Sequence, residues 1–291
     1  MKEQLTRITR QALAAARAAA LALVVLTGCA TTQGSMAEVE ALRSLVAADD
    51  ARPVVLITGS SRGIGLALAQ QYAERGWTVI ATCRTPSKAT ALSALADSSD
   101  NVFIFQLDVT DYAEMDALAE QLVGIPIDVL LNNAGILGGN DRQKFGTFDY
   151  TALDDVMAVN VKGPIRMTEV FIDHVAASEQ KKIMNISSVV GSVKRTFGGQ
   201  IFYRASKSAL NMSMRTIAKE LRRAQQPERK EVIIGLIHPG VVATDFAKGV
   251  PIPMIEPEES ARGVIKVIDE YYTTRRQSGD FMSYTGEELP W

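Results

Sequence analysis

The chain has 291 residues, of which 47% are hydrophobic and 22% are charged, and its formal net charge is −2. This length and composition predict a globular protein with one sizeable core. The near balance of charge and the aromatic content of 6% argue against nucleic-acid binding, and only two cysteines, Cys29 and Cys83, exclude a fold held together by disulfides.

The first 28 residues differ in kind from the rest. Positions 1–17 carry four basic side chains against one acidic side chain, and ten uncharged residues, mostly alanine, leucine and valine, fill 18–27. That run is too short to span a bilayer, and its basic flank is typical of a secretory signal. It ends in Leu-Thr-Gly-Cys, which resembles the bacterial lipobox and predicts a lipidated Cys29 at a new N-terminus. We expect a lipoprotein of the bacterial cell envelope, in contact with the membrane only through this lipid; the alternative is translation from Met36 and a cytoplasmic protein.

From residue 53 onward, short apolar runs alternate with stretches of helical periodicity, which is typical of a parallel sheet with helices on both faces. Strands are expected at 53–58, 78–83, 102–107, 127–132, 182–187, 231–237 and 281–283. Helices are expected near 64–75, 88–96, 112–122, 153–177, 203–223 and 257–272. We predict an α/β fold, a single Rossmann-type doubly wound sheet of about seven strands over 53–291. The leader (1–28) and a tether (29–52) with a short helix at 36–45 precede it.

A glycine-rich turn follows the first predicted strand and precedes a helix. Its glycines, Gly59, Gly63 and Gly65, have the spacing Gly-x-x-x-Gly-x-Gly. Glycines here let the backbone approach a pyrophosphate, which the N–H groups of the helix N-terminus can hold. The turn indicates a dinucleotide site, although alone it could be a simple helix entry.

The end of the second predicted strand bears on the choice of dinucleotide. It reads Ala-Thr-Cys-Arg and offers no carboxylate for an adenosine ribose. Arg84, with Arg62 in the turn, could instead bind a 2′-phosphate, so the sequence favours NADP(H) over NAD(H). Either arginine could also be a solvated surface charge.

A candidate catalytic group lies further along. Tyr203 and Lys207 are four residues apart and share one face of a predicted helix. A neighbouring ammonium favours phenolate, so we expect Lys207 to lower the pKa of the Tyr203 phenol toward working pH. Ser188 ends a predicted strand, where parallel sheets gather ligands, and could bond a substrate carbonyl oxygen.

In this order, these motifs resemble the short-chain dehydrogenase/reductase family over some four fifths of the chain. The resemblance implies a catalytic tetrad of Asn160, Ser188, Tyr203 and Lys207, with the Asn160 backbone holding a water of the proton relay. It implies an adenine contact at Asp108. With the residues named above, the implied cofactor-binding set is Gly59, Ser61, Arg62, Gly63, Ile64, Gly65, Arg84, Asp108, Val109, Asn133, Ala134, Gly135, Tyr203, Lys207, Pro239, Gly240, Val242 and Thr244.

Within that family the chain is similar to the C-factor and sniffer-like carbonyl reductases, in the motifs at 81–84, 203–211 and 286–291. This implies a homodimer that transfers hydride from NADPH to a small aldehyde, ketone or quinone, with Tyr203 as proton donor. The alternative is a dinucleotide-binding sensor or signalling protein of the C-factor type with little turnover, although a pure sensor has no need of the tetrad.

Two other classes of chemistry are disfavoured. A hydrolase would have only His174 and His238 as bases and lacks Gly-x-Ser-x-Gly around Ser187 or Ser188. We predict no metal, because no cluster of ligating residues has metal spacing.

Overall fold

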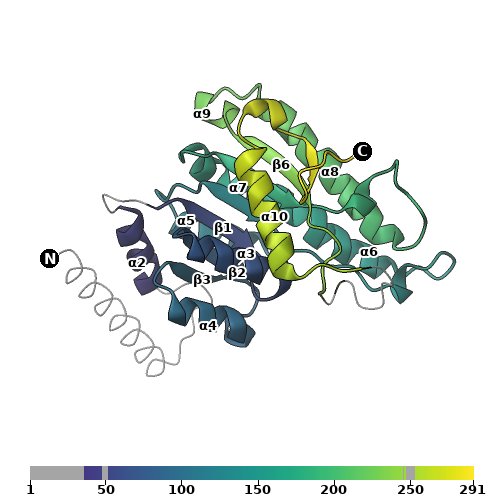
Figure 1. Cartoon of the computed structure of the whole chain (residues 1–291), viewed down its shortest axis with the longest axis horizontal. Helices are drawn as coiled ribbons and strands as arrows, with labels where there is room; N and C mark the ends of the chain where they lie inside the picture. Colours follow the sequence, from purple (N-terminus) through teal and green to yellow (C-terminus); the bar gives the residue numbers. More distant parts are fainter. Residues whose placement is uncertain (1–35, 48–51, 245, 247–252) are drawn as a thin grey trace.

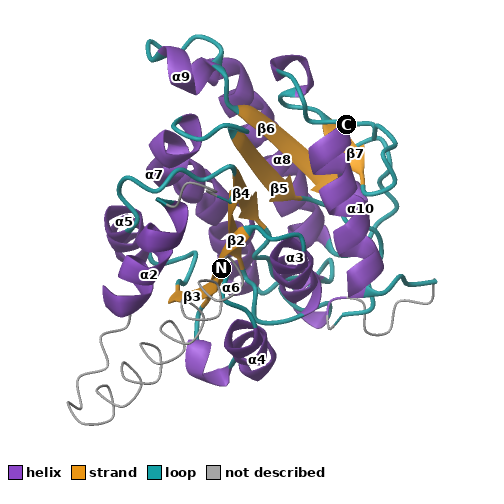
Figure 2. Ribbon diagram, turned by 60° about the vertical axis from the view of Figure 1, so that its left-hand side comes forward, coloured by secondary structure: helices purple, strands orange, loops and turns teal. Residues whose placement is uncertain are grey.

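The structure is a computed structural model that describes residues 36–47, 52–244, 246 and 253–291. Seven parallel strands form one sheet in the order β3-β2-β1-β4-β5-β6-β7, with helices on both faces (Figures 1 and 2). The strands are β1 (Val54–Thr58), β2 (Thr78–Cys83), β3 (Val102–Gln106), β4 (Val129–Asn132), β5 (Lys182–Ile186), β6 (Ile233–His238) and β7 (Phe281–Ser283). The predicted fold class is confirmed.

Each face of the sheet carries its own apolar core. Helices α3 (Gly63–Glu74), α4 (Thr90–Ser98) and α10 (Pro257–Glu270) cover one face. Helices α5 (Tyr112–Gln121), α7 (Gly163–Ala176) and α8 (Ile201–Leu221) cover the other. Every residue of β1, β2 and β4 is buried, as expected for strands covered on both sides. Strand order reverses between β1 and β4, so ligands are expected where these two strands end.

Helix α2 (Met36–Val46) covers the whole of the short helix predicted at 36–45 and extends it by one residue, and it packs against the domain. Val39 and Leu42 are buried in the core shared with α5, α7 and α8. The guanidinium of Arg43 donates to the carbonyls of Gln121 and Val123 at 2.9 and 2.8 Å, where α5 ends. The folded unit therefore includes residues upstream of 53.

The helix predicted at 153–177 is interrupted in the structure. It consists of α6 (Tyr150–Met157), a π-helical segment (Ala158–Lys162) and α7. Pro164 has no N–H to donate to the carbonyl of Asn160, four residues earlier, so a regular α-helical pattern cannot pass through this point. The segment that contains Asn160 is thereby set apart from both helices, as π-helical turns at functional sites often are. A short helix, α9 (Pro227–Lys230), precedes β6.

The leader and Cys29 lie outside the described residues. Within the described ranges, none of the helices combines the length and the apolar character that crossing a membrane requires.

Candidate active site

The glycine turn between β1 and α3 has the backbone that a bound pyrophosphate requires. Gly59 and Gly63 adopt positive φ values of +70° and +57°, which side chains other than glycine rarely adopt. A Cβ at Gly65 would lie 2.3 Å from the Gly59 carbonyl oxygen. The side chain of Arg62, the N-cap residue of α3, makes no capping hydrogen bond, so the first N–H groups of the helix face the turn. These features fit a dinucleotide phosphate.

The ends of β1 and β4 are joined by side-chain hydrogen bonds. The hydroxyl of Thr58 accepts the N–H groups of Asn133 and Ala134 at 3.0 and 3.1 Å. The amide of Asn133 donates to the carbonyls of Thr58 and Gly59 at 2.9 and 3.1 Å. Asn133 and Ala134 therefore fix the glycine turn against β4. Thr58 was not predicted as a site residue, although it stands directly before the turn in the sequence.

The loop after β6 reaches the same place. A Cβ at Gly63 would lie 3.2 Å from the Thr244 methyl group, so this loop lies against the glycine turn. Gly240 has a φ of +88°, and the Pro239 carbonyl accepts a hydrogen bond from Ser260 of α10 at 2.6 Å. Val242 forms an isolated bridge with Ile255. The predicted residues of this loop thus surround one side of the site.

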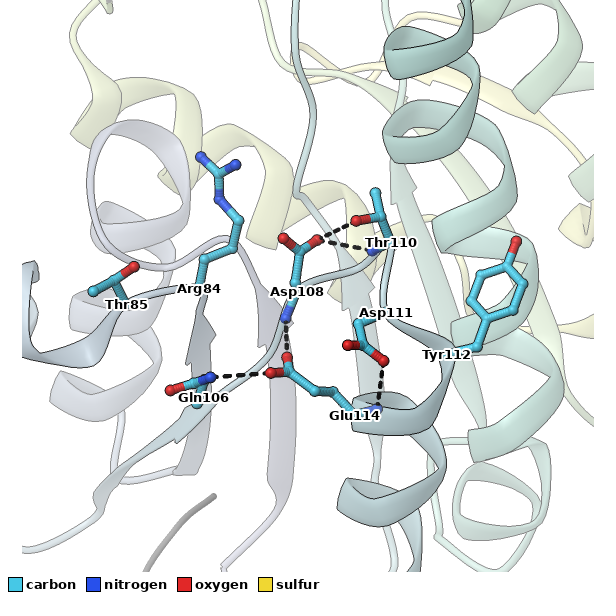
Figure 3. Close-up of a pocket in the computed structure, with 8 residues that line it drawn as sticks. All are labelled: Arg84, Thr85, Gln106, Asp108, Thr110, Asp111, Tyr112 and Glu114. Carbon is cyan, nitrogen blue, oxygen red and sulfur yellow. Dashed lines mark hydrogen bonds between the residues drawn. The ribbon is translucent and has the colours of Figure 1, made fainter. Parts of the chain in front are cut away.

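A polar hollow of about 750 Å³ lies beside the ends of β2 and β3 (Figure 3). It contains Arg84 and Asp108, the residues expected at the 2′-phosphate and at adenine. The Glu114 carboxylate connects the start of α5 to the end of β3 in this hollow, because it accepts hydrogen bonds from the Asp108 N–H at 2.7 Å and from the Gln106 amide at 3.0 Å. The remaining lining residues are Thr85, Thr110, Asp111 and Tyr112.

Glu114 was not singled out from the sequence. The pattern Asp111-x-x-Glu114 at the start of α5 resembles a capping box, and Asp111 does accept the Glu114 N–H at 3.0 Å. The Glu114 carboxylate, however, bonds to the end of β3. Of the other predicted cofactor residues, Ser61 and Ile64 lie on the glycine turn, and Val109 is buried next to Asp108.

Ser188, Tyr203 and Lys207 come together where β5 ends. Ser188 follows β5, and its side chain shares a hydrogen bond with the hydroxyl of Tyr203 on α8. The Lys207 Nζ lies 5.8 Å from the centre of the Tyr203 ring. The three side chains therefore form one cluster at the carboxyl edge of the sheet, as predicted.

Asn160 joins this cluster through Gly135. A Cβ at Gly135 would lie 3.3 Å from the Asn160 Oδ1 and 3.7 Å from the Lys207 Nζ, so the glycine lets both groups approach the loop after β4. The Asn160 amide holds Ile136, accepting from its N–H and donating to its carbonyl at 2.8 Å each.

Burial dominates the titration of the site. It raises the pKa of Tyr203 to about 12, and the hydrogen bond with Ser188 offsets only part of this. Burial also lowers the pKa of Lys207 to about 8. The expected lowering of the phenol pKa by Lys207 is wrong here: removing a phenolate from water raises the pKa by more than the hydrogen bond with Ser188 lowers it, and Lys207 is not among the causes of the shift. Tyr203 is therefore protonated at neutral pH.

Comparison with known proteins agrees with this geometry. The model of the family described as short chain dehydrogenase matches residues 53–252. The chain belongs to the short chain dehydrogenase family and is an NAD(P)-dependent oxidoreductase, as its sequence predicted.

Three similar proteins illustrate the range of the family. C-signal of Myxococcus xanthus is 35% identical over 178 residues, which cover 61% of this chain and all of that protein. The structure of an NADPH-bound carbonyl reductase from chicken fatty liver is 30% identical with a TM-score of 0.73. The carbonyl reductase Sniffer of Drosophila melanogaster is 28% identical with a TM-score of 0.72. Each of the two structures covers 82% of this chain and is itself covered completely.

Proposed function

We propose that this protein reduces a small aldehyde, ketone or quinone with NADPH, and that Tyr203 donates the proton to the substrate oxygen. The observation that carries the proposal is the meeting of Ser188, Tyr203 and Lys207 where β5 ends: the buried Lys207 Nζ lies 5.8 Å from the centre of the Tyr203 ring and donates to the carbonyl of Ile186, two residues before Ser188. Two hydroxyls at one point can both donate to a carbonyl oxygen and stabilise the negative charge that develops on it.

Each side chain of the cluster has a distinct task. The raised pKa keeps Tyr203 protonated until the substrate oxygen takes the proton. Ser188 orients that oxygen, and the Lys207 ammonium stabilises the phenolate left on Tyr203. Asn160 holds the loop at Ile136. Its backbone carbonyl receives no N–H from Pro164, and we expect it to hold the water that returns a proton. Hydride is the chemistry that NADPH supplies when it is bound.

The residues that would hold NADP(H) lie along the carboxyl edge of the sheet. The glycine turn and the start of α3 fit the pyrophosphate. Arg84, with Arg62, would bind the 2′-phosphate, and Asp108 and the hollow beside it would receive adenine. The loop at Thr244 would lie beside the nicotinamide. The similarity to the NADPH-bound chicken carbonyl reductase supports NADP(H) over NAD(H).

A second candidate is a dinucleotide-binding signalling protein with little turnover. The observation in its favour is the similarity to C-signal, which extends over the whole of that protein. Both candidates need the dinucleotide site, but only the reductase needs the Tyr203 cluster.

The test measures NADPH oxidation with a panel of aldehydes, ketones and quinones, and NADPH binding by tryptophan fluorescence. We expect oxidation with at least one class of carbonyl compound, and a loss of about 10²-fold or more in Tyr203→Phe with unchanged NADPH binding. Tyr271→Phe is the matched control, because its hydroxyl bonds Asp280 away from the site. Binding without oxidation across the panel would favour the signalling protein, and an active Tyr203→Phe variant would refute the role of Tyr203.

We also propose that the mature protein is anchored by a lipid on Cys29, since the lipobox stands directly after a signal-like leader. Mass spectrometry of the mature N-terminus decides this. A lipidated Cys29 supports the anchor, whereas a chain that begins at Met36 supports the cytoplasmic alternative.

A further inference from the structure

The catalytic helix α8 does not begin with a cap of its own. The cap position is Gln200, which has a left-handed backbone with φ +50° and makes no capping side-chain bond within the described structure. Without a substitute, the first N–H groups of α8 would be left without partners in a buried site. Two of these groups belong to Phe202 and to Tyr203 itself.

Gln143 supplies the missing cap from 60 residues upstream. Its Oε1 accepts the N–H groups of Phe202 and Tyr203 at 3.0 and 3.2 Å. These are the second and third residues of α8, whose N–H groups an N-cap side chain ordinarily bonds.

The other end of the same amide holds the loop after β4. The Nε2 of Gln143 donates to the carbonyls of Leu137 and Gly139 at 2.9 and 3.0 Å. Only one orientation of the amide satisfies two N–H groups on one side and two carbonyls on the other. The Gln143 side chain, only 2% exposed, is thus a fully bonded link between this loop and the start of α8.

A second route connects the same loop to the same tyrosine. Asn160 holds Ile136 and donates to the Ser206 hydroxyl at 3.0 Å, and Ser206 donates to the Tyr203 carbonyl at 2.7 Å. The peptide groups on both sides of Tyr203 are therefore tied to residues 136–139, one through Gln143 and the other through Asn160. The two connections together hold the tyrosine backbone in place relative to that loop.

We propose that Gln143 is a positioning residue, which fixes the Tyr203 hydroxyl at Ser188 by capping α8 and linking it to the loop after β4. The inference rests on the proposed role of Tyr203 as proton donor. Because the rate of proton transfer depends steeply on geometry, a displacement of about 1 Å can lower the rate by about 10²-fold. NADPH binding depends on other side chains and should change little.

The test uses the full chain with Gln143→Met, which has a similar shape but makes none of the four hydrogen bonds. We expect kcat to fall about 10- to 100-fold while the KM for NADPH stays within about twofold. Hydrogen exchange, which needs no turnover, should accelerate at the amides of Phe202 and Tyr203 but not in the second half of α8. Thr274→Ala removes a side-chain cap from a remote helix and should change neither kcat nor this exchange.

A second variant covers the case in which Gln143→Met does not fold. Gln143→Glu keeps an acceptor for the two N–H groups but sets an oxygen against the carbonyls of Leu137 and Gly139, which breaks the link to the loop, so kcat should again fall without a change in the KM for NADPH. The proposal is overturned if kcat stays within about twofold of wild type, or if the amides of Phe202 and Tyr203 exchange at the wild-type rate. If no carbonyl compound is reduced at all, the proposed function fails, and the exchange measurement still decides whether Gln143 fixes Tyr203.

Discussion

The ammonium of Lys207 donates a hydrogen bond of 2.8 Å to the backbone carbonyl of Ile186, the last residue of β5. This bond joins the catalytic helix to the strand that delivers Ser188. A carbonyl accepts the hydrogen bond but does not neutralise the charge, so the buried ammonium remains costly and the pKa of Lys207 falls to about 8.

The lowered pKa of Lys207 predicts how stability changes with pH. The unfolded lysine titrates at its ordinary pKa of 10.5 and the folded one at about 8. Between these values the unfolded state holds a proton that the folded state has lost, so this group makes the protein more stable as pH rises. Between about pH 7.5 and about pH 9.5, we expect the free energy of unfolding of wild type to rise by about 2 kcal/mol relative to that of Lys207→Met. Urea unfolding of both proteins measures this, and a difference that does not change with pH would contradict it.

Arg84 should determine the preference for NADPH. Loss of a charged hydrogen bond to the 2′-phosphate in Arg84→Ala should raise the KM for NADPH about 10- to 100-fold and leave the KM for NADH within about twofold. Steady-state kinetics with both cofactors measure this. Arg276→Ala, an exposed arginine on a remote short helix, is the control. An equal change for both cofactors would show that Arg84 does not contact the phosphate.

Gly65 should not tolerate a side chain. The Cβ of Gly65→Ala would lie 2.3 Å from the Gly59 carbonyl oxygen and 2.5 Å from the Asn133 Nδ2, so the glycine turn must shift. We expect NADPH affinity to fall at least about 10-fold and the free energy of unfolding to fall about 1–3 kcal/mol. Fluorescence titration and urea unfolding measure the two effects.

Gly76→Ala is the control that distinguishes the steric clash at Gly65 from the effect of replacing a glycine where no clash arises. A Cβ there meets no described atom within 4 Å, although φ is +79°. We expect the free energy of unfolding to fall by about 1–2 kcal/mol, because alanine disfavours this backbone conformation, and NADPH affinity to stay unchanged. Wild-type affinity in Gly65→Ala would mean that the turn adapts.

Leu42 tests whether α2 belongs to the core. This leucine is fully buried, so Leu42→Ala should lower the free energy of unfolding by about 2–5 kcal/mol while kcat at a temperature below unfolding stays within about twofold. Met36→Ala, at a side chain that is 84% exposed, should change stability by less than about 0.5 kcal/mol. Equal stabilities of the two variants would show that α2 does not contribute to the core in solution.

Much of the fold could be predicted because buried parallel strands leave continuous apolar runs. The second strand was predicted with its observed bounds, and the fourth begins two residues later than expected. At that point Asp128 bonds the Val54 N–H with its carboxylate at 2.9 Å, a contact that no local pattern reveals. The break at Pro164 was not predicted, although the proline itself is a sequence signal for it. The packing of α2 was not predicted because it depends on partners far away in the sequence.

The site divides in the same way. Short sequence spacings were enough to predict the Tyr203–Lys207 pair, four residues apart, and the glycine turn. The direction of the Tyr203 pKa shift could not, because it depends on how deeply the phenol is buried. The capping-box pattern marks Glu114 only as a helix start, and no pattern marks Gln143, because the contacts through which both act have no fixed spacing in the sequence.

The packing of α2 limits where the N-terminus of this protein can be cut. The family match begins at residue 53, yet Val39 and Leu42 upstream of it fill the common core. A peptidase that acts before Met36, as processing at Cys29 requires, would leave this core whole. Cleavage between 46 and 53 would instead separate α2 from the domain and expose to water the apolar core that Val39 and Leu42 cover. Maturation of the chain is therefore compatible with its fold only upstream of α2.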